Sequence, residues 1–80
     1  MPKRAAPEPK RQRTAPEIFG RNLRNARIKA GLTQVEVSQM TGIQQPRLSA
    51  LEAGKHDVLI STALKLAQAV GCPLSDLFIE

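Results

Sequence analysis

The sequence predicts an all-α fold, and three observations lead to this prediction. Apolar residues recur at helical spacing in several segments, whereas no segment alternates apolar and polar residues as a half-buried strand does. Glycines follow the apolar stripes at the points where helices are expected to stop. With 80 residues the chain has the size of one small domain. Trp and Tyr are absent, so we expect an aliphatic core that includes Phe19 and Phe78.

Residues 1–16 differ in composition from the rest of the chain. They hold five Lys and Arg residues against one Glu, a net charge of +4, whereas residues 17–80 hold seven against six acidic residues. They also contain four of the six prolines and show no apolar periodicity. We therefore expect a disordered basic arm over residues 1–16, suited to an anionic polymer such as nucleic acid, and a folded domain over residues 17–80. A solubilising tail and a localisation signal are the alternatives for the arm.

Two helices are expected in the first half of the domain. The first covers residues 17–30, and Gly31 supplies its stop. Its apolar face consists of Phe19, Leu23, Ala26 and Ala30. The second begins after Thr33, because Thr33 and Glu36 have the spacing of a capping box, and it ends at Gly42.

Three further helices are expected in the second half. The third starts near Gln44 and ends at Gly54, and the fourth runs from about Ile60 to Gly71. The fifth follows Pro73. Their inward side chains are expected to be Leu48 and Leu51, then Ile60, Ala63, Leu66, Ala67 and Val70, and finally Leu74, Leu77 and Phe78. The periodicity therefore predicts a compact domain of five helices.

Residues 34–53 have the organisation of a helix-turn-helix motif. Two short helices are joined by a turn of about four residues containing Gly42, which we expect to adopt a left-handed conformation. Ser38 is small, as the close approach of two helices requires. The apolar side chains expected to fill the space between the helices are those of Val37, Ile43, Leu48 and Leu51.

From "LRNARIKAGLTQVEVSQMTGI" through "PRLSALEAGK" to "TALKLAQAVGCPLSDLF", the sequence resembles the Cro/phage-repressor-type (XRE-like) helix-turn-helix regulators. The resemblance covers about residues 20–78 and is specific, because "AGLTQ", "TGI", "LEAGK" and "LAQAVG…LSDLF" occur at the spacings of that family. It implies a five-helix, lambda-repressor-like fold, in agreement with the helix count from periodicity. It also implies a sequence-specific DNA-binding transcriptional regulator, either a repressor or a switch regulator.

The resemblance points to the start of the third helix as the part that reads DNA. In helix-turn-helix proteins the first residues of the second motif helix face base edges in the major groove. The residues at these positions are Gln44, Gln45, Pro46 and Arg47, with Ala50 one turn further along. A glutamine amide can pair with adenine, an arginine with guanine, and an alanine methyl with the thymine methyl. Pro46 lies in the first turn, where its missing N–H breaks no helical hydrogen bond.

Other functional positions carry over from the resemblance one at a time. Gln34 matches a position that hydrogen-bonds a phosphate and braces the recognition helix. Lys55 matches a phosphate contact, and His56 beside it is a weaker candidate. For these residues an ordinary solvated surface position is the alternative. Arg27 and Glu52 match a partly buried ion pair that joins the first helix to the third, and its expected role is structural.

The chain also departs from the family pattern near the second half of the domain. Gln44 stands where a Ser or Thr cap is usual, and Leu59 stands where a small cap is usual. Val58, Leu59 and Ile79 are apolar residues that the expected helix faces leave exposed. We therefore expect these three residues to form part of a homodimer interface, with the dimer bound to a pseudo-palindromic operator in double-stranded DNA.

An enzyme is not expected from this sequence. His56 is the single histidine, and the single cysteine, Cys72, stands at an apolar position where a small core residue fits. No metal-ligand cluster, nucleophile–base pair or phosphate-binding loop is visible, so no catalytic residue, metal or cofactor is expected. No apolar run approaches the roughly 20 residues that span a bilayer. With no signal peptide and one cysteine, the cytoplasm is the expected compartment.

A protein-interaction module is the alternative function. An antitoxin, for example, would use the same domain to bind a partner protein as well as DNA. The basic arm, or the apolar group of Val58, Leu59 and Ile79, would have to provide the contact with such a partner.

Overall fold

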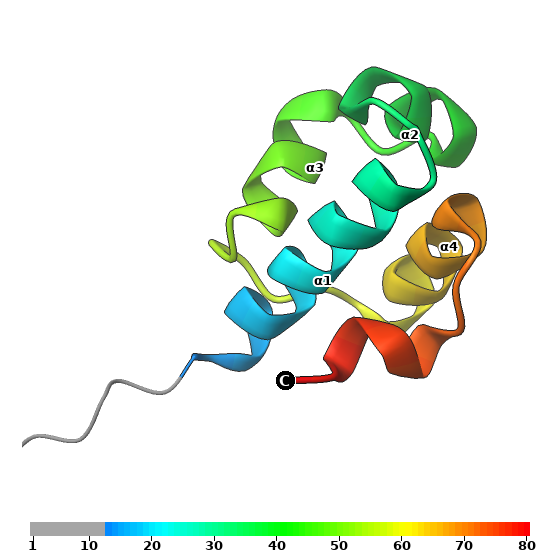
Figure 1. Cartoon of the computed structure of the whole chain (residues 1–80). Helices are drawn as coiled ribbons and strands as arrows, with labels where there is room; N and C mark the ends of the chain where they lie inside the picture. The colour runs from blue at the N-terminus through cyan, green and yellow to red at the C-terminus, as the bar shows by residue number, and fades with distance from the viewer. Residues whose placement is uncertain (1–12) are drawn as a thin grey trace, which may run out of the picture.

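The computed structural model describes residues 13–80, which fold into four α-helices and one short 3-10 helix (Figure 1). In chain order these are α1 (Ala15–Lys29), α2 (Gln34–Thr41), α3 (Gln45–Glu52), α4 (Ile60–Val70) and the 3-10 helix η1 (Leu74–Phe78). The described residues contain no strand, so the all-α prediction is confirmed. Residues 1–12, which make up most of the expected basic arm, lie outside the described residues.

Helix α1 runs through the middle of the domain and contacts α3, α4 and η1 (Figure 1). Helix α2 packs against α3 and α4 at the end of the domain away from η1. All five elements contribute to one apolar core. Its buried side chains are Phe19, Leu23, Val37, Leu48, Leu51, Ala63, Leu66, Ala67, Val70 and Leu77. The helical periodicity therefore identified most of this core correctly.

The first helix begins earlier than the sequence analysis expected. Thr14 and Glu17 form a capping box: Thr14 Oγ1 accepts from Glu17 N at 3.3 Å, and Glu17 Oε1 accepts from Thr14 N at 2.9 Å. Pro16 lies within the first turn, where a proline is tolerated. The expected boundary after residue 16 therefore falls inside α1. The Thr-x-x-Glu signal was missed in the sequence because prolines stand close to it.

The other corrections concern helix ends. The expected short fifth helix after Pro73 is the 3-10 helix η1, which begins with a hydrogen bond from Asp76 N to Pro73 O at 3.0 Å. Ile60 was expected in the core but is 79% exposed, because it is the first residue of α4 and lies at the rim of the core. Phe78 and Ala30 are also exposed, and both stand at the ends of their helices.

Candidate nucleic-acid interface

The turn between α2 and α3 is closed by side-chain hydrogen bonds. Gly42 has a φ of 77°, as expected for this turn, and its N–H donates to Ser38 O at 2.8 Å. The Ser38 hydroxyl donates to the carbonyl oxygen of Ile43. Thr41 Oγ1 donates to Val37 O at 2.8 Å and accepts from Ile43 N at 3.2 Å. Thr41 was not predicted from the sequence, although a short hydroxyl side chain directly before a helix-stop glycine is a recognisable turn signal.

The turn leads into a row of exposed side chains at the start of α3. The exposed residues are Gln44, Gln45, Pro46 and Arg47, whereas Ala50 is half-buried. Gln44 is the N-cap residue, and its side chain makes no capping hydrogen bond. Within the described residues, the side chains of Gln45 and Arg47 form no hydrogen bond or ion pair either. Leu48 and Leu51 are fully buried, so α3 presents its polar start to solvent while its apolar side holds it on the core.

The far end of α3 is fixed by a buried polar network. Arg27 Nε and Nη2 donate to the two carboxylate oxygens of Glu52 at 2.6 and 3.0 Å, and the two side chains are only 11% and 3% exposed. Arg27 Nη1 also donates to Leu32 O at 2.9 Å. The hydrogen bonding to Glu52 raises the pKa of Arg27 above its ordinary value, although burial opposes this effect. The ion pair expected from the resemblance therefore joins α1 to α3.

Gln34 belongs to the same network. Its Nε2 donates to Glu52 Oε1 at 3.0 Å, so the first residue of α2 is tied to the last residue of α3. An amide nitrogen carries two hydrogens, and this contact uses one of them. The half-buried amide therefore braces α3 and keeps a second N–H and a carbonyl oxygen for other partners.

A glycine that the sequence analysis did not consider sets the distance between α1 and α3. A Cβ atom added to Gly20 would lie 2.3 Å from Leu51 O and 2.6 Å from Glu52 O, both of them backbone atoms. Only a residue without a side chain fits at this crossing. A glycine inside a helix lowers helix stability by about 1 kcal/mol relative to alanine, so its presence in the middle of α1 was an available signal of close packing.

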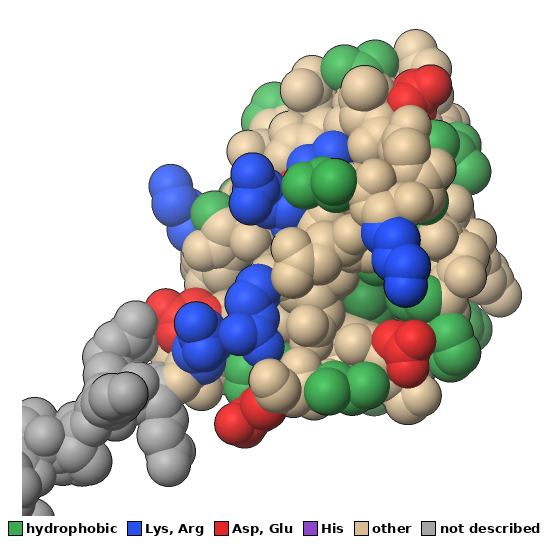
Figure 2. Space-filling view, in the orientation of Figure 1, with side chains coloured by type: hydrophobic (Ala, Val, Ile, Leu, Met, Phe, Trp, Pro, Cys, Tyr) green, Lys and Arg blue, Asp and Glu red, His purple; other side chains and the backbone are tan. Residues whose placement is uncertain are grey.

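Basic side chains gather on the face that carries α3 and α1. Figure 2 shows Lys and Arg side chains concentrated over these two helices. Apart from Arg27, which is bonded to Glu52, the exposed or half-buried basic residues on α1, on α3 and directly after α3 are Arg21, Arg24, Lys29, Arg47 and Lys55. Lys55 N donates to Ala50 O at 3.1 Å, which fixes its backbone at the end of α3 while its side chain is exposed. His56 is also exposed.

The three residues expected at a dimer interface differ in exposure. Leu59 and Ile79 are 68% and 60% exposed, as expected. Val58 is half-buried and packs against the core, so it is less exposed than expected, and the interface itself stays a prediction. The extended chain before α4 turns Val58 inward and Leu59 outward, since successive side chains of an extended segment point in opposite directions.

The family of the chain follows from its comparison with known proteins. A helix-turn-helix family model, HTH_3, matches residues 23–77, which is more than half of the chain. The chain belongs to this helix-turn-helix family. It is of the Cro/phage-repressor (XRE-like) type indicated by its motifs, a family of DNA-binding transcriptional regulators.

Two curated relatives of this helix-turn-helix protein illustrate the match. An uncharacterized HTH-type transcriptional regulator, y4dJ, from Sinorhizobium fredii is 40% identical over 55 residues, which cover 69% of this chain and 71% of the relative. An uncharacterized HTH-type transcriptional regulator from Archaeoglobus fulgidus is 33% identical over 57 residues, which cover 71% of this chain and 81% of the relative.

Two solved structures share the fold. The restriction-modification controller protein C.AhdI from Aeromonas hydrophila is 30% identical, with a TM-score of 0.74, and the match covers 79% of this chain and 96% of that protein. The clp gene regulator ClgR from C. glutamicum is 26% identical, with a TM-score of 0.79, and the match covers 82% of this chain and 86% of ClgR. The helix-turn-helix arrangement of this chain is therefore that of known gene regulators.

Other kinds of site are not supported by the described residues. Among residues 13–80 no group of three or more His, Cys, Asp or Glu side chains could hold a metal ion. Partial burial raises the pKa of the Cys72 thiol, and the negative charge of Asp76 raises it further, so the thiol is a poor nucleophile at neutral pH. None of the helices in this part of the chain is both long and apolar enough to cross a membrane.

Proposed function

We propose that this helix-turn-helix protein is a sequence-specific transcriptional regulator that binds DNA as a homodimer and reads the major groove with the start of α3. The exposed row Gln44–Arg47 carries the proposal, because it belongs to a helix that is anchored at its other end. The long side chains of this row form no hydrogen bond or ion pair with the described residues. The relatives named as transcriptional regulators support the same role, as do the controller protein and the clp gene regulator.

To read bases, the side chains at the start of α3 need hydrogen-bond donors and acceptors that can exchange water for base edges. The amides of Gln44 and Gln45 can each pair with the N6 and N7 atoms of adenine, and the Arg47 guanidinium can pair with O6 and N7 of guanine. Within the described residues these side chains break no hydrogen bond when they do so. Each bidentate pair discriminates against a wrong base by about 1–3 kcal/mol.

Phosphate contacts would set the position of α3 in the groove. Gln34 stands at the start of α2, and its second amide N–H can donate to a phosphate while its first holds Glu52. Lys55 follows the C-terminal end of α3, the same end to which Gln34 is bonded, and its ammonium group is exposed. Phosphate contacts from these two side chains would hold this end of α3 on the duplex.

A dimer doubles the sequence that can be read. One α3 reaches few base pairs, so two copies related by a two-fold axis would read two half-sites about 34 Å apart on a pseudo-palindromic operator. We propose repression or switching as the mode of regulation, exerted on DNA in the cytoplasm. The exposed Leu59 and Ile79 support self-association at the end of the domain away from α2 (Figure 1).

The basic arm is proposed to add affinity without sequence preference. Residues 1–12 include four Lys or Arg residues and one Glu. Deleting residues 1–12 keeps Thr14 and its capping box, so the fold should be preserved. The deletion should weaken binding to specific and random DNA alike and flatten the plot of log K against log salt by at most about 3.6 units. An unchanged salt slope would show that the arm does not neutralise phosphates.

Selection of DNA from a random pool by the purified protein tests the proposal. The expected product is an enriched pseudo-palindrome whose half-site centres lie about one helical turn apart, bound by two protein chains. Stoichiometry is measured by sedimentation of the complex with the selected duplex. A pool without enrichment would contradict sequence-specific binding. An enriched site bound by one chain would contradict the proposed dimer.

A further inference from the structure

Charge is divided unevenly between two parts of the folded chain. Residues 18–56 carry six Lys and Arg residues and two glutamates, whereas residues 57–80 carry one lysine and three acidic residues. The first part holds most of α1 and all of α2 and α3, and its net charge is +4, against −2 for the second part. A polyanion is therefore attracted to the side of the domain that carries α1 and α3, where basic side chains gather (Figure 2).

Both glutamates of the basic part are engaged within the protein. Glu36 Oε1 accepts from Thr33 N at 2.8 Å in the capping box of α2. Glu52 lies in the buried network at the end of α3, and its side chain is only 3% exposed. The charge that this part of the chain presents to solvent is therefore mostly positive.

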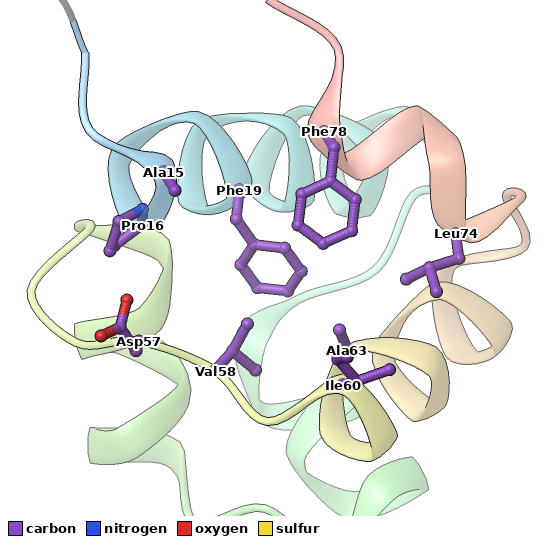
Figure 3. Close-up of a pocket in the computed structure, with 9 residues that line it drawn as sticks. All are labelled: Ala15, Pro16, Phe19, Asp57, Val58, Ile60, Ala63, Leu74 and Phe78. Carbon is purple, nitrogen blue, oxygen red and sulfur yellow. The ribbon is translucent and has the colours of Figure 1, made fainter.

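The opposite end of the domain offers an anion no favourable contact. An apolar cavity of about 450 Å³ lies there, between the starts of α1 and α4 and the helix η1 (Figure 3). Eight of its nine lining residues are apolar, and the ninth is Asp57, whose carboxylate repels negative charge. An anionic partner is therefore directed to the helices of the basic part.

Three of the four basic residues of α1 have positions that the fold accounts for. Arg27 is bonded to Glu52, and Arg21 Nη2 donates to Glu80 O at 3.1 Å. Lys29 lines a hollow formed with the end of α4 and the turn that follows it. These three side chains therefore have contacts within the domain.

Arg24 is the fourth, and it lies in the row of α1 residues that faces α3. Glu17 lies against the turn after α3, and Gly20 lies against the backbone of the last turn of α3. Arg27 reaches the same turn through Glu52. Arg24 follows Gly20 by four residues and precedes Arg27 by three, so it belongs to this row. Within the described residues its side chain is exposed and forms no hydrogen bond or ion pair.

The charge of Arg24 is uncompensated in the free protein. Arg21 and Arg27 stand three residues to either side of it, and like charges at neighbouring positions of a helix repel each other. No acidic residue follows Glu17 in α1. An anion bound beside the last turn of α3 would relieve this repulsion.

We propose that Arg24 contacts a DNA phosphate beside the C-terminal end of α3 and completes a group of three donors with Gln34 and Lys55. The proposal rests on the DNA binding proposed above and adds a contact from α1. The three side chains come from α1, from α2 and from the turn after α3, and all belong to the same end of the reading helix. The planar guanidinium of an arginine can donate to two phosphate oxygens at once. Arg24 is thus a positioning residue that fixes the tilt of α3 and reads no base.

The salt dependence of binding tests this contact. Arg24→Gln removes the charge and keeps a long side chain that favours helix. Binding of the full chain is measured on the selected operator and on a random duplex. One lost phosphate contact lowers the slope of log K against log salt by about 0.9, so the ratio of parent to variant affinity should fall about 3.5-fold between about 50 and 200 mM salt. The fall should be the same on both duplexes, because a phosphate contact carries no sequence information.

Lys29→Gln is the matched control. It removes the same charge from the same helix, but at a position that faces α4, and it should leave the salt slope unchanged. Arg24→Lys keeps the charge and should retain the slope of the parent. The urea midpoint of Arg24→Gln should equal or slightly exceed that of the parent, because a like-charged neighbour of Arg27 is removed. Loss of folding therefore cannot explain a lower slope.

Methylphosphonate substitution, which neutralises one operator phosphate at a time, locates the contact. Binding of the parent and of Lys29→Gln should weaken at one phosphate per bound chain where Arg24→Gln shows no further loss. An unchanged salt slope, an unchanged methylphosphonate profile in Arg24→Gln, or an equal loss of slope in Lys29→Gln would overturn the proposal and leave the proposed function standing. A random pool that yields no operator would contradict the proposed function, while the slope on the random duplex still tests Arg24. A parent that binds neither duplex would overturn both.

Discussion

The four α-helices of the described residues begin in two different ways. Helices α1 and α2 each start with a complete capping box, formed by Thr14 with Glu17 and by Thr33 with Glu36. Helices α3 and α4 start at Gln44 and Leu59, and neither side chain caps its helix. The capped helices, α1 and α2, serve the framework of the domain. The uncapped starts are the two places where exposed side chains are proposed to meet DNA and a second copy of the chain.

Helix α3 is instead positioned from its C-terminal end. Its last turn lies against Gly20 of α1, with no room for a side chain between the helices. Glu52 is bonded to Arg27 and Gln34 from two other helices. The first turn of α3 therefore needs no capping bond to stay in place, and Gln44 is available for contacts outside the protein.

The largest effect is expected from removing the anchor of α3. Glu52→Ala leaves the Arg27 guanidinium buried without its partner, which should lower stability by about 3–5 kcal/mol, because both side chains are nearly buried. For a domain of this size the melting temperature should fall by about 12 °C or more. Replacing Arg27 by Met together with Glu52 by Leu should restore much of the loss. A melting temperature unchanged in Glu52→Ala would refute an anchoring role for the pair.

The next effect is expected at the crossing of α1 and α3. Gly20→Ala places a Cβ atom against two backbone carbonyls that can move only with α3, and should lower the free energy of unfolding by about 1–3 kcal/mol. Asn25→Ala is the control, because Asn25 is exposed on the same helix and alanine favours helix. Urea denaturation of the two variants compares them. Equal stability of Gly20→Ala and the parent would mean that the helices are not held this closely.

Smaller effects of opposite sign are expected at the helix starts. Thr14→Ala and Thr33→Ala should each lose about 1 kcal/mol of stability, because each removes a capping bond. Gln44→Ser supplies a capping oxygen that is now missing and should raise stability by about 0.5–1 kcal/mol. The same change should weaken binding to the selected operator. If Gln44→Ala destabilised the fold as much as Thr33→Ala, the distinction between the two kinds of helix start would be lost.

The sequence predicted most of the fold because the signals involved are local. Helical periodicity found the core positions of α1, α3 and α4, and the Thr33 and Glu36 spacing found the start of α2. The start of α1 was predicted too late, because the prolines around Thr14 obscured its cap. The short fifth helix after Pro73 is present as the 3-10 helix η1. Ile60 has the right spacing for the core but stands at a helix end, which periodicity alone does not detect.

The site was predicted less completely, because it depends on how helices cross. The resemblance supplied the residues of the α3 start and the ion pair of Arg27 with Glu52. It did not supply Gly20, whose importance comes from backbone atoms of a helix more than 30 residues away. Nor did it separate Val58 from Leu59, since the direction of each side chain depends on the extended backbone before α4.

If the uncapped start of α3 reads bases, Gln45→Ala should change base preference and not only affinity. Binding of this variant and the parent is measured on the selected operator and on a full set of its single-base substitutions. The fold should survive, because Gln45 is exposed and the buried Leu48 and Leu51 still hold the helix. Binding to the preferred operator should weaken by about 1–3 kcal/mol, with preference relaxed at one base pair per half-site. An equal loss on every operator variant, or no loss at all, would contradict base reading by α3.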